Sequence, residues 1–250
     1  MFAKPVAVLS DIHGNRWALQ AVLKDIDRQE IKCIVNLGDS LYGPLDPIGT
    51  AQMLMERRIP TVRGNEDRIL VEALPEAAHS PSLDYVRGRL KAEHIEWLEA
   101  LEMTTVAYGD FFLCHGTPKR DDEYLLQEIL ERGVYLRRLA EVEARVGFLD
   151  QPVVLCGHDH VARTMRLPGG KLVVNPGSVG LPAYRDDLPY PHVMESGTPH
   201  ARYSIVRWRE GTWRVEEKTV EYEWEVAAEV ALKNDRLDWA DWLRTGRVVA

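Results

Sequence analysis

Five short segments rich in Asp, His, Asn and Gly lie before residue 161, and each follows a short apolar run. They are Asp11-Ile12-His13, Gly38-Asp39, Gly64-Asn65-Glu66-Asp67, His115-Gly116 and Gly157-His158-Asp159-His160. Apolar runs such as 5–10 (PVAVLS) and 33–37 (CIVNL) have the length and composition of buried strands. The carboxyl ends of strands in an α/β sheet meet at one edge, so segments far apart in sequence can converge there.

Helical patterns alternate with the first strands. Apolar residues recur every three to four positions between Arg16 and Gln29. Pro47–Arg58 forms a second predicted helix with a proline in its first turn, and Thr61–Arg63 a third short strand. The alternation predicts an α/β fold with a largely parallel sheet and helices packed on it.

The remainder of the chain predicts more strands than helices. Short strands are expected at 104–108, 111–114, 153–156, 162–167, 171–175, 202–208 and 213–219. Helical patterns occupy an insertion near 68–102, residues 121–145 and a C-terminal tail near 222–250. The proline-rich segment 181–200 is expected to be a long loop. Because the sequence contains no internal repeat or clear linker, we expect a single domain spanning 1–250.

The five segments offer side chains that bind transition metals. Carboxylates supply oxygen ligands, imidazoles supply nitrogen ligands, and the amide of Asn65 adds a neutral oxygen. In Asp11-x-His13 and His158-x-His160 the two ligands are two residues apart, which puts them on one side of an extended backbone. So many ligands exceed one tetrahedral site and suit two ions that share a carboxylate. The seven candidates are Asp11, His13, Asp39, Asn65, His115, His158 and His160.

Each segment taken alone has an ordinary structural explanation. An aspartate between a strand and a helix, such as Asp11, is a common helix cap. Gly38-Asp39 and Gly64-Asn65 are common turn dipeptides, and a lone His115 would be a hydrogen-bonded loop residue. The ordered occurrence of all five segments at strand ends favours a shared metal site instead.

The ordered set D-x-H, G-D, G-N-x-D, H-G and G-H-x-H resembles that of the calcineurin-like metallophosphoesterases, from residue 6 to about 180. The similarity is closest to the small bacterial and archaeal phosphodiesterase-like members, which also carry an N-P-G-S segment like Asn175-Pro176-Gly177-Ser178. The resemblance implies an α/β/β/α sandwich, in which two packed mixed β-sheets are flanked by helices.

The resemblance also implies how the ligands divide between two divalent transition-metal ions, whether manganese, iron, zinc, nickel or cobalt. One ion would be held by Asp11, His13, Asp39 and His160. The other would be held by Asp39, Asn65, His115 and His158, with Asp39 bridging the two. The family commonly has histidine after the glycine–asparagine pair, where this chain has Glu66. That difference leaves the identity of the general acid open.

The chemistry expected of such a site is hydrolysis of a phosphate ester by a hydroxide that bridges the two ions. Asp39, Glu66 and Asp67 are the candidate catalytic residues; Asp67 would orient a neighbour or cap the following helix. We hypothesise that the charge of Glu66 disfavours monoesters, which carry about two negative charges, relative to diesters. We therefore expect a phosphodiesterase acting on a small phosphodiester or nucleotide. The alternatives are a phosphomonoesterase or protein phosphatase, and a non-catalytic metal-binding scaffold.

Candidate substrate contacts are Arg68, Arg120, Arg163 and Tyr184, which neighbour the metal motifs or the loop after them. Arginine binds phosphate in a bidentate geometry, although most arginines so placed form surface ion pairs.

Other aromatic side chains lack such a pattern. The tryptophans at 208, 213, 224, 239 and 242 are expected to pack in the core and between helices, since no basic stripe accompanies them. His79 and His94 lack ligand spacing and are expected at the surface.

The net charge of −8 argues against stable nucleic-acid binding, while bound metal ions would still allow an anionic substrate. The three cysteines have no paired spacing, and the sequence shows neither a signal peptide nor an apolar stretch long enough to cross a membrane. We therefore expect a cytoplasmic protein whose partner is a small phosphate ester. The helical flanks are compatible with a homo-oligomer.

Overall fold

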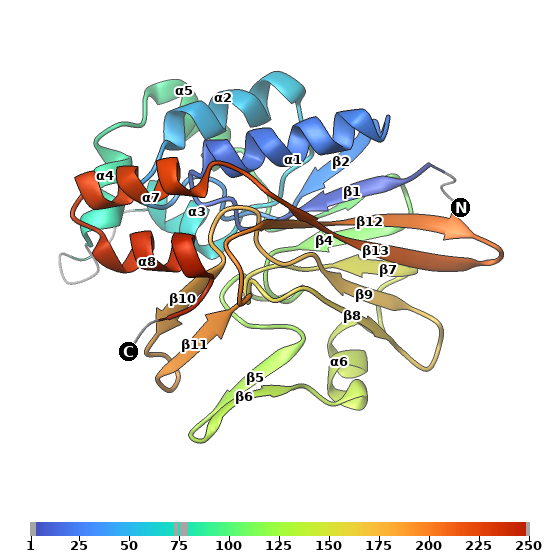
Figure 1. The fold of residues 1–250 in the computed structure, drawn as a ribbon. Coiled ribbons are helices and arrows are strands. Elements are labelled where there is room, and N and C mark those ends of the chain that lie inside the picture. Colours follow the sequence, from blue (N-terminus) through green and yellow to red (C-terminus); the bar gives the residue numbers. More distant parts are fainter. Residues whose placement is uncertain (1–3, 73–74, 76–79, 249–250) are drawn as a thin grey trace.

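Two β-sheets lie against each other at the centre of the computed structural model, with helices on the outer side of each (Figure 1). The structure describes residues 4–72, 75 and 80–248. The strand order is β13-β12-β1-β2 in the first sheet and β3-β4-β7-β9-β8 in the second. The first sheet consists of β1 (Val6–Leu9), β2 (Cys33–Asn36), β12 (Ala201–Arg209) and β13 (Thr212–Val220). The second consists of β3 (Thr104–Ala107), β4 (Phe111–Cys114), β7 (Val153–Leu155), β8 (Arg163–Arg166) and β9 (Leu172–Asn175).

Alternate side chains of β1 separate two layers of the core. Val6 and Val8 pack between the two sheets, whereas Ala7 and Leu9 pack on the helical side. On the far side of the second sheet, Val154 packs against α6 (Leu139–Val146). The order of layers is therefore helix, sheet, sheet, helix, which confirms the expected α/β/β/α sandwich.

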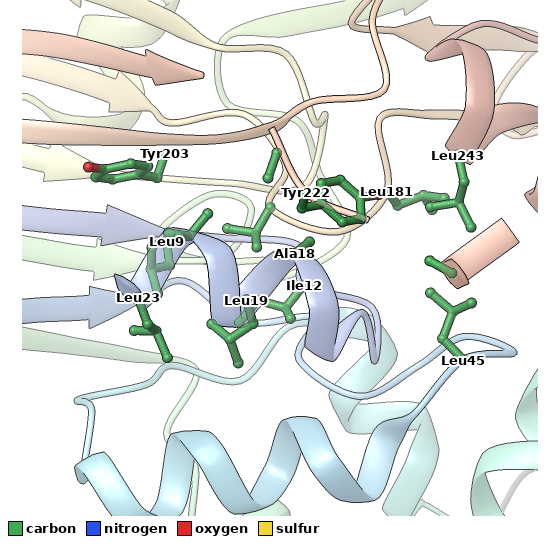
Figure 2. Close-up of a cluster of buried hydrophobic side chains, with 14 of the residues drawn as sticks. Leu9, Ile12, Ala18, Leu19, Leu23, Leu45, Leu181, Tyr203, Tyr222 and Leu243 are labelled. Carbon is green, nitrogen blue, oxygen red and sulfur yellow. The ribbon is translucent and has the colours of Figure 1, made fainter. Parts of the chain in front are cut away.

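The helices on the first sheet cover the edge at which the functional loops lie. Figure 2 shows part of the largest apolar cluster, in which Leu9, Leu19, Leu181 and Leu243 are all buried. Ile12, which stands between two candidate ligands, is fully buried in the same cluster and anchors their loop to the core. The helices of this side are α1 (Arg16–Arg28), α2 (Pro47–Arg57), α3 (Asn65–Val71), α4 (Pro81–Arg87), α5 (Ala92–Glu99), α7 (Trp224–Lys233) and α8 (Leu237–Thr245).

Both sheets are mixed, so the prediction of a largely parallel sheet was wrong. β1 pairs in parallel with β2 but antiparallel with β12, and β8 pairs antiparallel with β9. The reason is that β8–β9 and β12–β13 are hairpins, which can only form antiparallel pairs, and that β12 returns from the end of the chain to lie antiparallel beside β1. The segment predicted as a third strand forms only an isolated bridge between Asn36 and Thr61.

Two segments differ from their predicted conformation. Residues 121–145 were predicted to be helical, but residues 127–136 form the hairpin β5 (Gln127–Leu130) and β6 (Gly133–Leu136), and only the end of the segment, from Leu139, is helical. Gly133 has φ +129°, which L side chains rarely adopt, so the chain reverses there instead of continuing as a helix. The predicted loop 181–200 contains a second hairpin, β10 (Ala183–Asp186) and β11 (His192–Glu195).

Among the described residues, no helix combines the length and the apolar character that crossing a bilayer requires. His94 is not at the surface as predicted: it is 1% exposed, and its ring accepts a hydrogen bond from the backbone N–H of Lys91. His79 lies outside the described residues.

Candidate metal centre

Six of the seven candidate ligands form two adjoining groups of donor atoms. Asp11, His13 and His160 make one group, and Asp39, His115 and His158 the other, with the donor atoms of each within 4.8 Å of one another. The closest carboxylate–imidazole approach in the second group is 3.1 Å, from Asp39 Oδ2 to His115 Nε2. Residues that are up to 149 positions apart in sequence therefore converge at one edge of the sheets.

The two groups share a boundary. Asp11 Oδ1 lies 3.4 Å from His160 Nε2 in its own group and 3.9 Å from His115 Nε2 in the other. Asp39 also forms a third group with His13 and Glu66, so its carboxylate faces both sides. Asp39 therefore has ligand atoms of both groups within reach of its carboxylate.

Left-handed backbone conformations aim these side chains. Asp11, His13, Asp39, His158 and His160 all have φ between 50° and 74°, a region that non-glycine residues seldom occupy. The expectation of extended backbone in the two D-x-H and H-x-H segments was therefore wrong. Such conformations cost of order 1–3 kcal/mol each, persist where surrounding structure enforces them, and are concentrated at functional sites.

Two glycines allow the ligand loops to approach one another. A Cβ on Gly64 would lie 2.1 Å from Asp39 Oδ1, and one on Gly157 would lie 1.9 Å from Ser10 Oγ and 2.9 Å from Asp11 Oδ2. No side chain fits at either position without displacing a ligand loop.

Backbone carbonyls fix the orientation of three candidate histidines. Each ring places Nδ1 within hydrogen-bond distance of a carbonyl oxygen, so Nδ1 carries the proton and the lone pair of Nε2 points into the site. The pairs are His13 with Tyr42 (3.1 Å), His115 with Leu37 (2.8 Å) and His160 with Leu181 (2.8 Å). This arrangement is typical of histidines that bind metal.

Several buried donor atoms have no hydrogen-bond partner among the described residues. Asn65 Oδ1 and His115 Nε2 are both in this position. His13 Nε2 and His160 Nε2 face each other at 3.0 Å, where two lone pairs would repel without a cation or a proton between them. The donor set of carboxylate, amide and imidazole therefore fits divalent transition-metal ions.

Burial and neighbouring charges shift the acid–base equilibria of the cluster. Burial opposes the charged form of His115, yet the Asp39 carboxylate raises the pKa of this ring to about 10. Burial lowers the pKa of His158 to about 4, and His115 acts in the same direction. Burial raises the pKa of Glu66 to about 7, against the opposing effect of His13. Shifts in both directions within one cluster are typical of a functional site.

Asp67 holds two ligand loops together and does not face the cavity. It is fully buried, and its carboxylate accepts hydrogen bonds from the backbone N–H groups of Ser40 (2.9 Å) and Gly64 (3.2 Å). The loop that bears Asp39 is thereby tied to the start of α3. Asp67 combines the two roles considered from the sequence, a cap on the helix and a support for a ligand.

Glu66 lies at the edge of the metal-ligand cluster. Its side chain is 24% exposed, and Oε2 is 3.0 Å from His13 Nδ1, whose hydrogen-bond geometry favours the carbonyl of Tyr42. The backbone N–H of Glu66 donates to Asp39 Oδ1 at 2.9 Å. Glu66 therefore touches one candidate ligand with its side chain and another with its backbone.

A cavity of about 260 Å³ opens beside the two groups. Its aromatic lining comes from four separate parts of the chain, which supply Tyr42, Tyr124, Tyr184, and Trp239 with Trp242. The lining residues outside the ligand set include Tyr42, Glu66, Tyr124, Leu181, Tyr184, Arg185, Asp186, Arg236, Trp239 and Trp242.

Residues 5–194 match the model of the calcineurin-like phosphoesterase superfamily domain. The chain belongs to this superfamily. It is therefore one of the metal-dependent phosphoester hydrolases, and the two groups of donor atoms are its candidate metal-binding residues.

Similar proteins support the fold of this phosphoesterase. An uncharacterized protein of Methanocaldococcus jannaschii is 26% identical over 269 residues, with 96% of each chain covered. A metallophosphoesterase from Sphaerobacter thermophilus has a similar structure, with a TM-score of 0.72, 24% identity and coverage of 95% of this chain and 99% of that one. A hypothetical protein from Pyrococcus horikoshii OT3 also gives a TM-score of 0.72, at 23% identity and coverage of 98% and 99%.

The three arginines considered as substrate contacts do not line the cavity beside the phosphoesterase metal groups. Arg68 forms a bidentate pair with Asp121, at 2.7 and 3.2 Å, and Arg120 is engaged by Asp122 at the surface. Arg163 lines a different groove, beside the β5–β6 hairpin. Of the four proposed contacts, only Tyr184 lines the cavity.

Sequence reasoning missed the part of the phosphoesterase site that α8 supplies. Trp239 and Trp242 pack in the core as expected, but they also line the cavity together with Arg236. Arg185 and Tyr42 line it as well. Arg185 is adjacent in sequence to Tyr184, which offered one signal, whereas no sequence pattern links the C-terminal helix to the metal motifs.

Proposed function

We propose that this chain is a phosphodiesterase that hydrolyses a small phosphodiester or nucleotide with the help of two divalent transition-metal ions. The observation that carries the proposal is the meeting of two donor groups at Asp39. One ion would be held by Asp11, His13, Asp39 and His160. The second would be held by Asp39, Asn65, His115 and His158.

When bound, two such ions supply positive charge that stabilises the phosphoryl group and activate water for attack on phosphorus. The residues of the chain keep their donor atoms fixed for this purpose. Carbonyl oxygens orient the rings of His13, His115 and His160, and the backbone N–H of His158 holds Asp11 at 3.2–3.3 Å. In a preorganised site of this kind, rearrangement during the reaction requires little free energy.

The size of the cavity favours a small substrate. A volume of about 260 Å³ lies just below the roughly 300–1,000 Å³ typical of sites that enclose a drug-sized ligand. A small phosphate ester suits such a space better than a protein substrate, which supports a small ester over a protein phosphatase substrate.

Glu66 supports a preference for diesters. It lines the cavity and contacts His13. Its negative charge would therefore repel a monoester, which carries about two negative charges, more strongly than a diester, which carries one. Because the side chain is partly exposed, a substituted residue can also be accommodated at this position. Glu66→Gln removes the charge and keeps the shape, whereas Glu66→His restores the residue common in the family.

The experiment that tests the function compares hydrolysis of bis-p-nitrophenyl phosphate with that of p-nitrophenyl phosphate. The protein is stripped of metal and reloaded with manganese. We expect faster cleavage of the diester, complete dependence on metal, and loss of activity in Asp39→Asn. Asp122→Asn, which changes an exposed carboxylate outside the cavity, is the matched control and should retain full activity.

Other outcomes would support the alternatives. Faster cleavage of the monoester would indicate a phosphomonoesterase. Retention of two ions without cleavage of either ester would favour a metal-binding scaffold. If Glu66→Gln and Glu66→His leave the diester-to-monoester ratio unchanged, the role assigned to the charge of Glu66 is wrong.

A further inference from the structure

One wall of the cavity comes from a helix that lies outside the segment matched to the superfamily. The match ends at residue 194, whereas α8 begins at Leu237 and contributes Arg236, Trp239 and Trp242 to the cavity. In Figure 1, α8 lies beside β10, and the two elements are in contact. Whatever this wall recognises is therefore additional to the metal chemistry of the family.

Aromatic rings lead outward from the metal-ligand cluster along this wall. Trp239 meets His13 edge to face, with ring centroids 5.9 Å apart and an interplanar angle of 75°. Trp242 follows at 6.3 Å from Trp239. A group attached to a phosphate at the metal-ligand cluster would reach Trp242 within the length of a sugar and a base.

The α8 wall is held in place on three sides. Arg236 pairs with Asp238 at 2.9 and 2.7 Å and also contacts Ser82 on α4. Gly43 leaves room for Trp239, because a Cβ there would lie 2.7 Å from the indole. At the other end, the carbonyl of Gly246 accepts a hydrogen bond from the N–H of Gly197 at 2.9 Å. The wall is thus preformed, which lowers the entropic cost of binding a ligand.

The chemistry of the cavity favours a flat ring. Trp242 is 9% exposed and lines the cavity, and Tyr42, Tyr124 and Tyr184 supply further rings around the same space. Aromatic edges carry partial positive charge and pair with the faces of other rings. A planar heterocycle satisfies this surface better than a sugar or a short alkyl chain.

We propose that the α8 wall is a binding site for the base of a nucleotide, with Trp242 as the residue that selects for the base. The inference rests on the proposed function, because it takes the phosphate to be bound at the metal-ligand cluster. The volume of the cavity accommodates one nucleoside. Substrates of the enzyme would then be esters that carry a nucleoside on one side of the phosphate.

The test measures binding, so that it does not depend on turnover. Adenosine 5′-monophosphate and ribose 5-phosphate share the phosphate and the sugar and differ only in the base. We expect the manganese-loaded protein to bind the nucleotide about tenfold more tightly in isothermal titration calorimetry, as apolar contact and one edge-to-face pair would give. In Trp242→Leu the two ligands should bind within about twofold of each other.

Two further variants separate recognition from folding. Trp242→Phe keeps an aromatic ring and should retain most of the preference for the nucleotide. Trp208→Leu removes a tryptophan that packs edge to face against Trp213, with ring centroids 5.3 Å apart, and does not line the cavity, so it should leave the preference unchanged. Thermal unfolding of each variant shows whether the fold is kept.

Equal binding of both ligands by the wild-type protein would overturn the proposal. So would an equal loss of affinity for both ligands in Trp242→Leu, because the wall would then serve the fold alone. Hydrolysis of bis-p-nitrophenyl phosphate is measured in parallel. Absence of that hydrolysis would contradict the proposed function, while the binding comparison still decides whether the wall recognises a base.

Discussion

The Nδ1 atom of His115 lies 2.8 Å from the carbonyl oxygen of Leu37, and the other ring nitrogen lies 3.1 Å from Asp39 Oδ2. The carbonyl of Leu37, which directly follows β2, thereby orients the imidazole so that its other nitrogen faces Asp39. His94 is a natural comparison, since it is also buried but lies on α5 outside the cluster, where its ring accepts a hydrogen bond from the backbone N–H of Lys91.

We expect His115→Ala to reduce metal content from about two ions to about one per chain, because the second group loses a ligand held by a fixed carbonyl. His94→Ala should retain both ions. Elemental analysis after dialysis measures the stoichiometry. A metal at a hundred times its dissociation constant stabilises a folded protein by about 2.7 kcal/mol per site, so chelation should lower the unfolding midpoint of the wild type more than that of His115→Ala. Equal loss of metal in both variants would count against the assignment.

Ser10 and Gly157 are expected to be energetically coupled. Gly157→Ala places a Cβ 1.9 Å from Ser10 Oγ, so it should destabilise the protein by about 3 kcal/mol in urea unfolding. Ser10 Oγ is buried without a partner among the described residues, so Ser10→Ala alone should cost little. The double variant should recover about 1 kcal/mol or more of the free energy of unfolding, because the clash with Ser10 Oγ is removed. The recovery should be incomplete, because the clash with Asp11 Oδ2 remains. Strict additivity in this double-mutant cycle would argue against the close approach.

Arg185 is expected to bind the anionic substrate from the rim of the cavity. It is exposed, lines the cavity and has no ion-pair partner among the described side chains. Arg185→Gln should raise KM for bis-p-nitrophenyl phosphate about fivefold at low salt, as expected for one charge at the surface. The difference should shrink in 0.5 M salt, where the charges are screened. Arg209→Gln, on the exposed end of β12, is the control; an equal effect there would indicate a general loss of positive charge.

Arg68 is expected to act on stability and not on substrate binding. Its guanidinium pairs with Asp121, whose side chain is only 9% exposed. Arg68→Met should lower the free energy of unfolding by about 2 kcal/mol, because it leaves a buried carboxylate without its partner. KM should stay within twofold of the wild-type value. Arg120→Met, which breaks an exposed pair, should leave the free energy of unfolding almost unchanged. A large rise in KM for Arg68→Met would instead support a direct contact between Arg68 and the substrate.

The donor atoms were predictable because every candidate ligand except Asn65 follows a strand within a short motif. Asp11 and His13 follow β1, and the carboxyl ends of neighbouring strands meet by geometry alone. The segments 121–145 and 181–200 were mispredicted, since their pairing is decided by tertiary contacts. The hydroxyl groups of Tyr184 on β10 and Tyr124 form a hydrogen bond of 2.6 Å, although the two residues are 60 positions apart. No local sequence pattern predicts such a contact.

The sequence by itself identified the candidate ligands, because motif order is a local property of the chain, and the family resemblance carried by those motifs implied the layered fold. Only the tertiary structure decided which side chains face the substrate. Arg68 and Arg120 are taken up by neighbouring carboxylates, while Trp239 and Trp242 reach the cavity from a helix that begins more than 70 residues after the last ligand, His160. Ion pairing and helix docking depend on three-dimensional proximity, and the spacing of residues along the chain does not encode it.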